Sequence, residues 1–389
     1  MATRSATRAR SLLIDRVRST LAQVGDAFPY IADPATGDWH VTTDGNWCGG
    51  HWIGMLWIAY EVTGEARFET AARSATERMR AQLPAKNMFY GMNNHYAGFR
   101  TYDVTGEDKH RAIGTDGADR TVESFHEFAR QVPLGTLEID APAENFRGPD
   151  NGGDENVPSG ARLGAVDAIY TSLPVLWRAY DETGDPTYRD VAVSHADRHL
   201  DWYIRPDGST WHHVEFDPET GGVRRKYNEL AVSDETCWAR GQGWCVAGLA
   251  RAYRETRAER YRHALERVVD YYVAHSPDDL VPYWDFEHPD APSVERDTSA
   301  ASLAAYGLTR LSETAETAHL VETGQRILTS LIEDYLTPTR DDDDRPAGMV
   351  LESCYNGPAD FATANEHVWT DYYVLYALHR AISDRGASD

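Results

Sequence analysis

The pattern of apolar and polar positions repeats along the chain as pairs of helices. Residues 56–79 and 176–200 each read as an apolar helix, a turn at Thr-Gly and a second, amphipathic helix. Weaker copies of the pattern begin at Leu249 and Leu308. Helical hairpins repeated in this way predict a repeat or toroid architecture, because each hairpin needs its neighbours to bury its apolar face.

Residues at the expected turns support this interpretation. Gly64 and Gly184 stand where the C-terminus of a helix favours a left-handed residue. Asp185 and Pro186 follow directly and suit the start of the next helix, because proline is tolerated in a first turn. The sequence therefore marks both ends of the turn inside a hairpin.

Strand patterns are short by comparison. Residues 209–216 alternate apolar and polar positions and precede Asp-Pro-Glu-Thr-Gly-Gly, which predicts a small β-hairpin. The longest expected loop, residues 141–162, is rich in Gly, Asp, Asn and Pro, and such loops are often functional. Since no linker divides the chain, we expect a single domain over residues 1–389. It is a ring of helical hairpins with short strands and long loops at one end.

Charge and composition narrow the function classes. The 38 basic and 62 acidic residues give a formal net charge of −24, which argues against nucleic acid and anionic membranes as partners. No apolar run approaches the ~20 residues of a membrane span, and the N-terminus lacks the apolar core of a signal peptide. We therefore expect a soluble, cytoplasmic protein. The scarcity of lysine fits either a salt-rich cytoplasm or a biased genomic base composition.

The four cysteines form no CxxC pair, so neither a metal site nor a disulfide framework is expected. The 11 tryptophans and 21 tyrosines fit a sugar-binding surface as well as a core.

Asp167 is a candidate general acid. It lies in the segment GAVDAIYTSLPVLW, among apolar residues. Burial there would raise the pKa of the carboxyl group and suit it to acid/base catalysis near neutral pH. The alternative is that Asp167 caps the helix that follows, and the two roles are compatible.

Arg240 and Trp244 are candidate substrate-binding residues. They are four residues apart in WARGQGW and would share one helix face, where a guanidinium could pair with a sugar carboxylate and an indole could stack on a pyranose. The alternative is a structural Arg on a core Trp. On the predicted hairpin, His212 and His213 should point to opposite sides, which argues against a metal pair. One of them is expected to bind sugar, unless both are surface histidines.

Residues 93–96, with the sequence Asn-Asn-His-Tyr, form an unusual polar cluster. Asn94, His95 and Tyr96 could neutralise a uronate, abstract a C5 proton and protonate a leaving oxygen, which is β-elimination chemistry. The alternative is an ordinary polar loop. Trp47 and Trp52 flank small residues and could form an aromatic wall, or a core aromatic pair.

Taken together, these segments resemble the unsaturated glucuronyl hydrolases, glycoside hydrolase family 88. The resemblance covers most of the chain. It rests on six blocks in order: NWCGGHWIGMLWIAYEVTGE, VDAIYTSLPVLWRAYDETGDPTYR, DGSTWHHVEFDPETG, WARGQGW, YWDFEHPDAPSVERDTSAAS and VWTDYYVLYAL.

The resemblance implies an all-α fold, an (α/α)6 barrel, without a metal or organic cofactor. It also implies hydration of the C4=C5 double bond in a terminal unsaturated uronate of an acidic oligosaccharide. Asp167 matches the family's general acid/base. The positions that line the family's substrate subsite correspond to Trp47, His212, Arg240 and Trp244.

Two positions depart from the family pattern. The family carries His-Asp-x-Gly-Phe where this chain has residues 95–99, so a second active-site aspartate is replaced by Tyr96, and Leu230 stands in place of a glutamine. Three hypotheses follow: a hydrolase of unsaturated uronides, a uronate lyase that uses His95 and Tyr96, or a non-catalytic relative that binds acidic sugars. We expect a monomer or homodimer.

Overall fold

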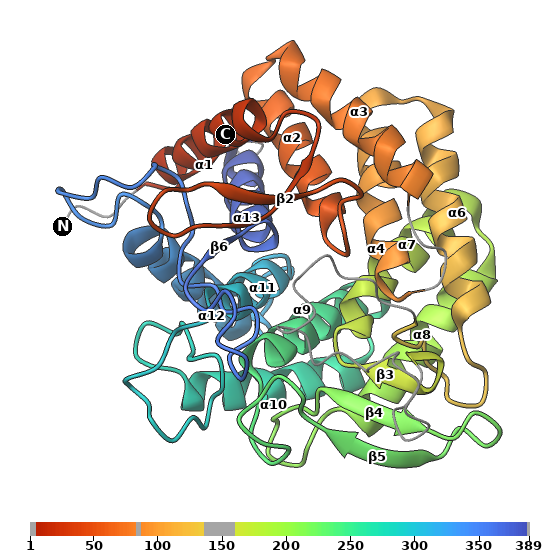
Figure 1. Ribbon diagram of the computed structural model, residues 1–389. Coiled ribbons are helices and arrows are strands. Elements are labelled where there is room, and N and C mark those ends of the chain that lie inside the picture. The colour runs from red at the N-terminus through yellow and green to blue at the C-terminus, as the bar shows by residue number, and fades with distance from the viewer. Residues whose placement is uncertain (1–4, 83–86, 136–159, 387–389) are drawn as a thin grey trace.

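The computed structural model describes residues 5–82, 87–135 and 160–386. Its helices form two concentric rings (Figure 1). The inner ring consists of α2 (Gly49–Thr63), α4 (Phe89–Asn94) with its continuations η1 (His95–Arg100) and α5 (Thr101–Thr105), α7 (Ala168–Thr183), α9 (Ala239–Thr256), α11 (Thr298–Leu308) and α13 (Val368–Gly386). The outer ring consists of α1 (Ala6–Val24), α3 (Ala66–Gln82), α6 (Asp108–Ser124), α8 (Pro186–Trp202), α10 (Glu259–His275) and α12 (Ala318–Ser330) with η4 (Leu331–Tyr335). The predicted (α/α)6 barrel is confirmed.

The expected turns have the predicted geometry. Gly64 and Gly184 are left-handed, with φ of 71° and 73°, and each donates its N–H to a carbonyl of the preceding helix. Asp185 caps α8 by accepting the N–H of Thr187, and Pro186 is the first helical residue. These local signals explain why the repeat could be recognised from the sequence.

Two three-stranded sheets accompany the helices. One has the order β2 (Trp39–Thr42), β1 (Phe28–Ala32), β6 (Glu366–His367), and the other has the order β3 (Leu163–Ala165), β4 (His213–Phe216), β5 (Val223–Tyr227). The predicted hairpin is β4–β5, with His213 opposite Tyr227. Of the expected loop, residues 141–159 lie outside the described residues, and residues 160–162 form a 3-10 turn. No helix among the described residues has the length and hydropathy needed to cross a bilayer.

Buried charges join the first helix of the ring to its last segment. Arg16 of α1 donates from Nε to Glu366 Oε1 at 2.8 Å and from Nη2 to the carbonyl of Gly37 at 2.8 Å. The side chains of Arg16 and Glu366 are 4% and 0% exposed. Asp371, at the start of α13, is also buried, and its pKa is raised by burial and then by the Glu366 carboxylate. Ring closure therefore depends on a desolvated ion pair.

Candidate active site

Asp167 lies directly before α7. It makes no capping hydrogen bond, so the alternative capping role is not observed. Asp167 is 7% exposed, and its Oδ2 accepts no hydrogen bond from the residues that the structure describes. Burial raises its pKa to about 6, against the opposing effect of Arg240 and His213. Such a carboxyl group can hold and release a proton near neutral pH.

His212 faces this carboxyl group, with its Nε2 3.9 Å from Asp167 Oδ2. The expected divergence of His212 and His213 is wrong, because their rings stack with centroids 3.7 Å apart. The reason is that His212 lies in a bend just before β4, where strand alternation has not yet begun. Burial lowers the pKa of His212 well below its usual value, and its Nδ1 has no hydrogen-bond partner within residues 5–82, 87–135 and 160–386. A neutral imidazole therefore stands beside the acid.

Arg240, in the first turn of α9, is held rigidly at the same end. Its Nη1 donates to the carbonyl of Cys354 and its Nη2 donates to that of Tyr355 at 2.8 Å. The guanidinium lies 4.7 Å from the ring of Trp238 and 3.9 Å from Asp297 Oδ2. The remaining N–H groups are the ones that could meet a substrate carboxylate.

Trp47 belongs to an aromatic wall at this end of the barrel. Its Nε1 donates to the hydroxyls of Tyr30 at 3.1 Å and Tyr355 at 3.2 Å. Its ring lies 5.0 Å from that of Phe89 and 4.7 Å from that of Trp369, between centroids. Segments from the beginning and the end of the chain therefore build one surface.

The start of each repeat occupies an equivalent place in the ring. The helices α2, α5, α7 and α9 each end in a left-handed residue, at positions 64, 106, 184 and 257. The residues seventeen positions before these caps are 47, 89, 167 and 240. This constant spacing places them at or next to the N-terminal ends of α2, α4, α7 and α9. Trp47, Phe89, Asp167 and Arg240 are thus equivalent positions at one end of the barrel.

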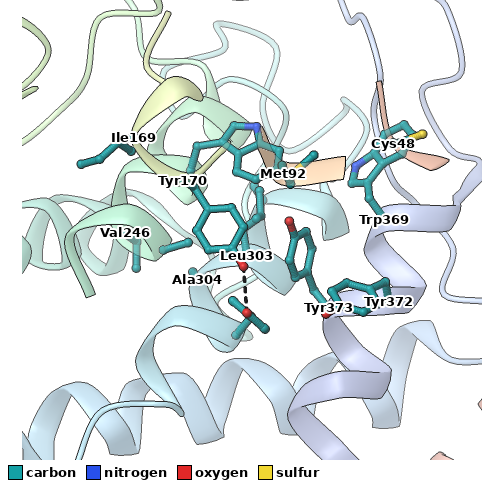
Figure 2. Close-up of a cluster of buried hydrophobic side chains, with 14 of the residues drawn as sticks. Cys48, Met92, Ile169, Tyr170, Val246, Leu303, Ala304, Trp369, Tyr372 and Tyr373 are labelled. Carbon is teal, nitrogen blue, oxygen red and sulfur yellow. Dashed lines mark hydrogen bonds between the residues drawn. The ribbon is translucent and has the colours of Figure 1, made fainter. Parts of the chain in front are cut away.

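Tyr96 packs against the first turn of α2, where its ring adjoins Gly50 and lies 5.2 Å from that of His51, between centroids. It follows Phe89 by seven residues, or about two helical turns, inside the π-helix η1. It is 2% exposed, and its hydroxyl lies 3.4 Å from that of Tyr170. Figure 2 shows Tyr170 with Tyr372 and Tyr373 in the aromatic cluster that fills the barrel. Tyr96 belongs to the aromatic layer inside the barrel, and its place as the replacement of a second active-site aspartate stays a prediction.

Trp244 lies in the same layer. It is 1% exposed, and its ring stacks on that of Tyr170 at 5.6 Å and 29°. Trp238 and Trp47, at 4% and 7% exposed, are the more accessible indoles beside Arg240 and Phe89. Stacking of Trp244 on a sugar stays a prediction.

His95 and Asn94 lie apart from Asp167. The segment is helical, so the alternative of a polar loop is wrong. Asn94 donates to the carbonyl of Tyr90 at 2.9 Å, and its Cβ faces Gly117 of α6. His95 has its pKa lowered by burial and then by four arginines of the helices' C-terminal halves. Neither side chain contacts the acid among the described residues.

The sequence interpretation gave no role to Trp238, Tyr355 or Phe89. Trp238 stood inside a recognised block, and Phe89 could have been found by counting back from the Thr105-Gly106 turn. Among the described residues, no group of three His, Cys, Asp or Glu side chains is arranged to hold a metal ion.

Known proteins resemble this chain over most of its length. The chain is 28% identical to the unsaturated glucuronyl hydrolase of Bacillus sp. strain GL1 over 92% of each chain. It is 29% identical to the unsaturated chondroitin disaccharide hydrolase of Streptococcus pneumoniae over 90% of this chain and 86% of that protein. The crystal structure of the Bacillus sp. GL1 enzyme superposes with a TM-score of 0.83 at 26% identity, covering 97% of each chain.

The family model for Glycosyl Hydrolase Family 88 matches residues 24–378. This match spans five of the six inner helices completely and most of the sixth. The predicted enzyme class, a glycoside hydrolase, is confirmed. The chain belongs to Glycosyl Hydrolase Family 88.

Proposed function

We propose that the protein releases a terminal 4,5-unsaturated uronic acid from an acidic oligosaccharide, with Asp167 as the general acid. The observation that carries this proposal is the buried Asp167 carboxyl group. It has a pKa of about 6 and a free Oδ2, and it lies 3.9 Å from a neutral His212. Relatives named as unsaturated glucuronyl and chondroitin disaccharide hydrolases support the substrate class.

The chemistry needs one proton donor and one water molecule. Asp167 gives its proton to C4 of the vinyl ether, and the positive charge that develops is shared by C5 and the ring oxygen. Water adds at C5 and returns a proton to the Asp167 carboxylate, which leaves a hemiketal. The hemiketal opens to a C5 ketone, and the resulting hemiacetal at C1 expels the next sugar as an alcohol and becomes an aldehyde.

Other residues bind rather than react in this scheme. Arg240 supplies positive charge for the uronate carboxylate, although two of its nitrogens already donate to backbone carbonyls. Trp47 and Trp238 offer ring surface, and His212 offers the unpartnered Nδ1 as a sugar hydrogen-bond group. Two carboxylates in the usual glycosidase arrangement are not required.

The lyase alternative has less support. Burial raises the pKa of Tyr96 well above its usual value, and its hydroxyl faces Tyr170. His95 is kept neutral but contacts Tyr96 and Phe99. The scheme above therefore gives neither residue a contact with substrate.

We also propose that residues 1–389 act as one domain, in the cytoplasm, as a monomer or homodimer.

Ultraviolet absorbance of the conjugated C4=C5 uronate tests the proposal. With a panel of unsaturated uronyl disaccharides, absorbance should fall with wild-type protein and stay constant with Asp167→Asn. Arg240→Ala should weaken the binding of acidic disaccharides about tenfold or more, whereas the exposed Arg225→Ala serves as a matched control. Turnover by Asp167→Asn, or rising absorbance on intact uronate polysaccharides, would overturn it.

A further inference from the structure

A buried carboxylate lies close to the guanidinium that the proposed function assigns to the uronate. Asp297 Oδ2 is 3.9 Å from Arg240 Nη1, and the side chains of Asp297 and Arg240 are 0% and 4% exposed. Because water is excluded from both groups, their charges act on each other more strongly than those of a surface pair. A ligand that binds to Arg240 therefore meets a positive charge that a fixed negative charge already offsets in part.

The other oxygen of Asp297 fixes the beginning of α11. Oδ1 accepts the N–H of Ser299 at 3.0 Å and the Ser299 hydroxyl at 2.5 Å, as a helix cap does. It also accepts the N–H of Cys354 at 3.2 Å. The carbonyl of the same Cys354 receives the hydrogen bond from Arg240 Nη1. The carboxylate and the guanidinium are thus both attached to one residue, which keeps them facing each other.

Oδ2 of Asp297 has no comparable structural task. It is buried and accepts no hydrogen bond from any residue within the described ranges. A helix cap needs one acceptor oxygen, so an uncharged side chain such as asparagine could hold α11 equally well. Burying a carboxylate oxygen without a hydrogen bond costs free energy. The retention of a charged side chain here indicates a role for the charge itself.

The charge at this place is set by Asp297 and Arg240. Burial raises the pKa of Asp297, and Arg240 opposes this effect by favouring the ionised form. Tyr272 of α10 and the thiol of Cys354 also interact electrostatically with Asp297. Burial raises the pKa of both groups well above their usual values, so both stay neutral. Neither group can therefore replace the negative charge of Asp297.

We propose that Asp297 is a positioning residue whose charge weakens the hold of Arg240 on acidic sugars. The inference rests on the proposed function, because it takes Arg240 as the partner of the uronate carboxylate. A second carboxylate that approaches Arg240 is attracted by the guanidinium and repelled by Asp297. The substrate and the released uronate both carry this carboxylate. The same repulsion that weakens substrate binding therefore speeds the release of the product.

Isothermal titration calorimetry with a saturated glucuronyl disaccharide, at about pH 8 and constant ionic strength, tests the inference. This ligand has the carboxylate but no C4=C5 double bond, so the proposed reaction cannot consume it. Asp297→Asn keeps an oxygen for the cap and removes the charge, and it should bind the ligand about fivefold more tightly than wild type, or better. Asp342→Asn makes the same change on the surface, where Asp342 is 85% exposed, and should bind as wild type does.

A neutral glucosyl disaccharide shows whether the gain depends on charge. Tighter binding of the acidic disaccharide alone by Asp297→Asn supports the role of Asp297. Unchanged or weaker binding of it, or an equal gain for the neutral disaccharide, overturns that role. A loss in a folded Asp297→Asn is what a merely structural residue would give. Should circular dichroism show that Asp297→Asn is unfolded, Asp297→Ser replaces it, with the same expected and contrary results.

Arg240→Ala separates this inference from the proposed function. If Arg240→Ala loses affinity for the acidic disaccharide while Asp297→Asn gains none, only the role of Asp297 is overturned. If Arg240→Ala binds the acidic disaccharide as tightly as wild type does, the carboxylate subsite of the proposed function is wrong, and the role of Asp297 is overturned with it.

Discussion

The imidazole of His195, on the outer helix α8, lies 2.9 Å from the carbonyl oxygen of Ala168, the residue after Asp167. Its Nδ1 accepts the N–H of Val132 at 3.2 Å, which leaves Nε2 as the donor to Ala168. Burial lowers the pKa of His195 to about 4, so the ring is neutral and the tautomer is fixed at physiological pH. One buried ring therefore fixes the backbone beside the candidate acid.

His195→Phe keeps the ring volume and removes both hydrogen bonds. The carbonyl of Ala168 and the N–H of Val132 then stay buried without partners, so we expect a loss of about 2–5 kcal/mol in unfolding free energy. Because Asp167 adjoins the freed backbone, kcat should fall as well. Urea unfolding and steady-state kinetics measure the two effects. If His195→Phe lost neither stability nor kcat, the hydrogen bonds of His195 would not be needed to hold the backbone beside Asp167.

The raised pKa of Asp167 should make stability depend on pH. The pKa of Asp167 is about 6 in the folded protein, against 3.8 for an aspartate in the unfolded chain. A raised carboxyl pKa stabilises the fold below pH 3.8, and this contribution is lost as pH rises through 6. The loss is about 3 kcal/mol at full ionisation. The unfolding free energy of Asp167→Asn relative to wild type should therefore rise between pH 4 and pH 7. Urea unfolding of both proteins at the two pH values measures this difference, and a difference that is the same at both would contradict the prediction.

The same group should set the pH dependence of activity. Only the protonated carboxyl group can act as the acid, so kcat/KM should fall about tenfold per pH unit well above pH 6. His212 is neutral over this range and should not add a second step there. A pH–rate profile that stays flat from pH 6 to pH 8 would exclude Asp167 as the proton donor in the free enzyme.

Tyr96→Phe should retain hydrolysis within a fewfold of wild type. The hydroxyl of Tyr96 is 3.4 Å from that of Tyr170, a long and weak hydrogen bond, and the ring fills the layer beneath the site. His212→Ala provides the contrast, because its side chain faces Asp167 and its loss should reduce kcat/KM at least tenfold. If Tyr96→Phe were the inactive variant, the assignment of Tyr96 to the core layer would be wrong.

Arg16→Met should destabilise the barrel by about 3–5 kcal/mol, because it leaves Glu366 buried without its partner. The double variant Arg16→Met with Glu366→Met removes both charges and should recover much of that loss. Urea unfolding of the three proteins measures the difference. Equal destabilisation of the single and double variants would show that packing, not unpaired charge, is responsible.

The sequence was sufficient for the helical repeat, because Gly64 and Gly184 and the cap at Asp185 are local signals. The surroundings of Tyr96 could not be predicted in this way. Its contact with Gly50 at the start of α2 joins segments more than forty positions apart, which a five-residue motif does not record.

The two histidines show a different limit. Alternation along a strand predicts opposite sides for His212 and His213, but the strand begins only at His213. The partners of Arg240, at residues 354 and 355, are more than a hundred positions away. Contacts of this kind arise from ring closure, which no local pattern records.

Closure by Arg16 and Glu366 also has a consequence for biosynthesis. These residues are 350 positions apart, so Arg16 leaves the ribosome long before its carboxylate partner exists. Trp47 likewise waits for Trp369 before the aromatic wall can form. A nascent chain that lacks α13 therefore has neither a closed ring nor a finished active site, and the hydrolase becomes competent only after this helix has been made.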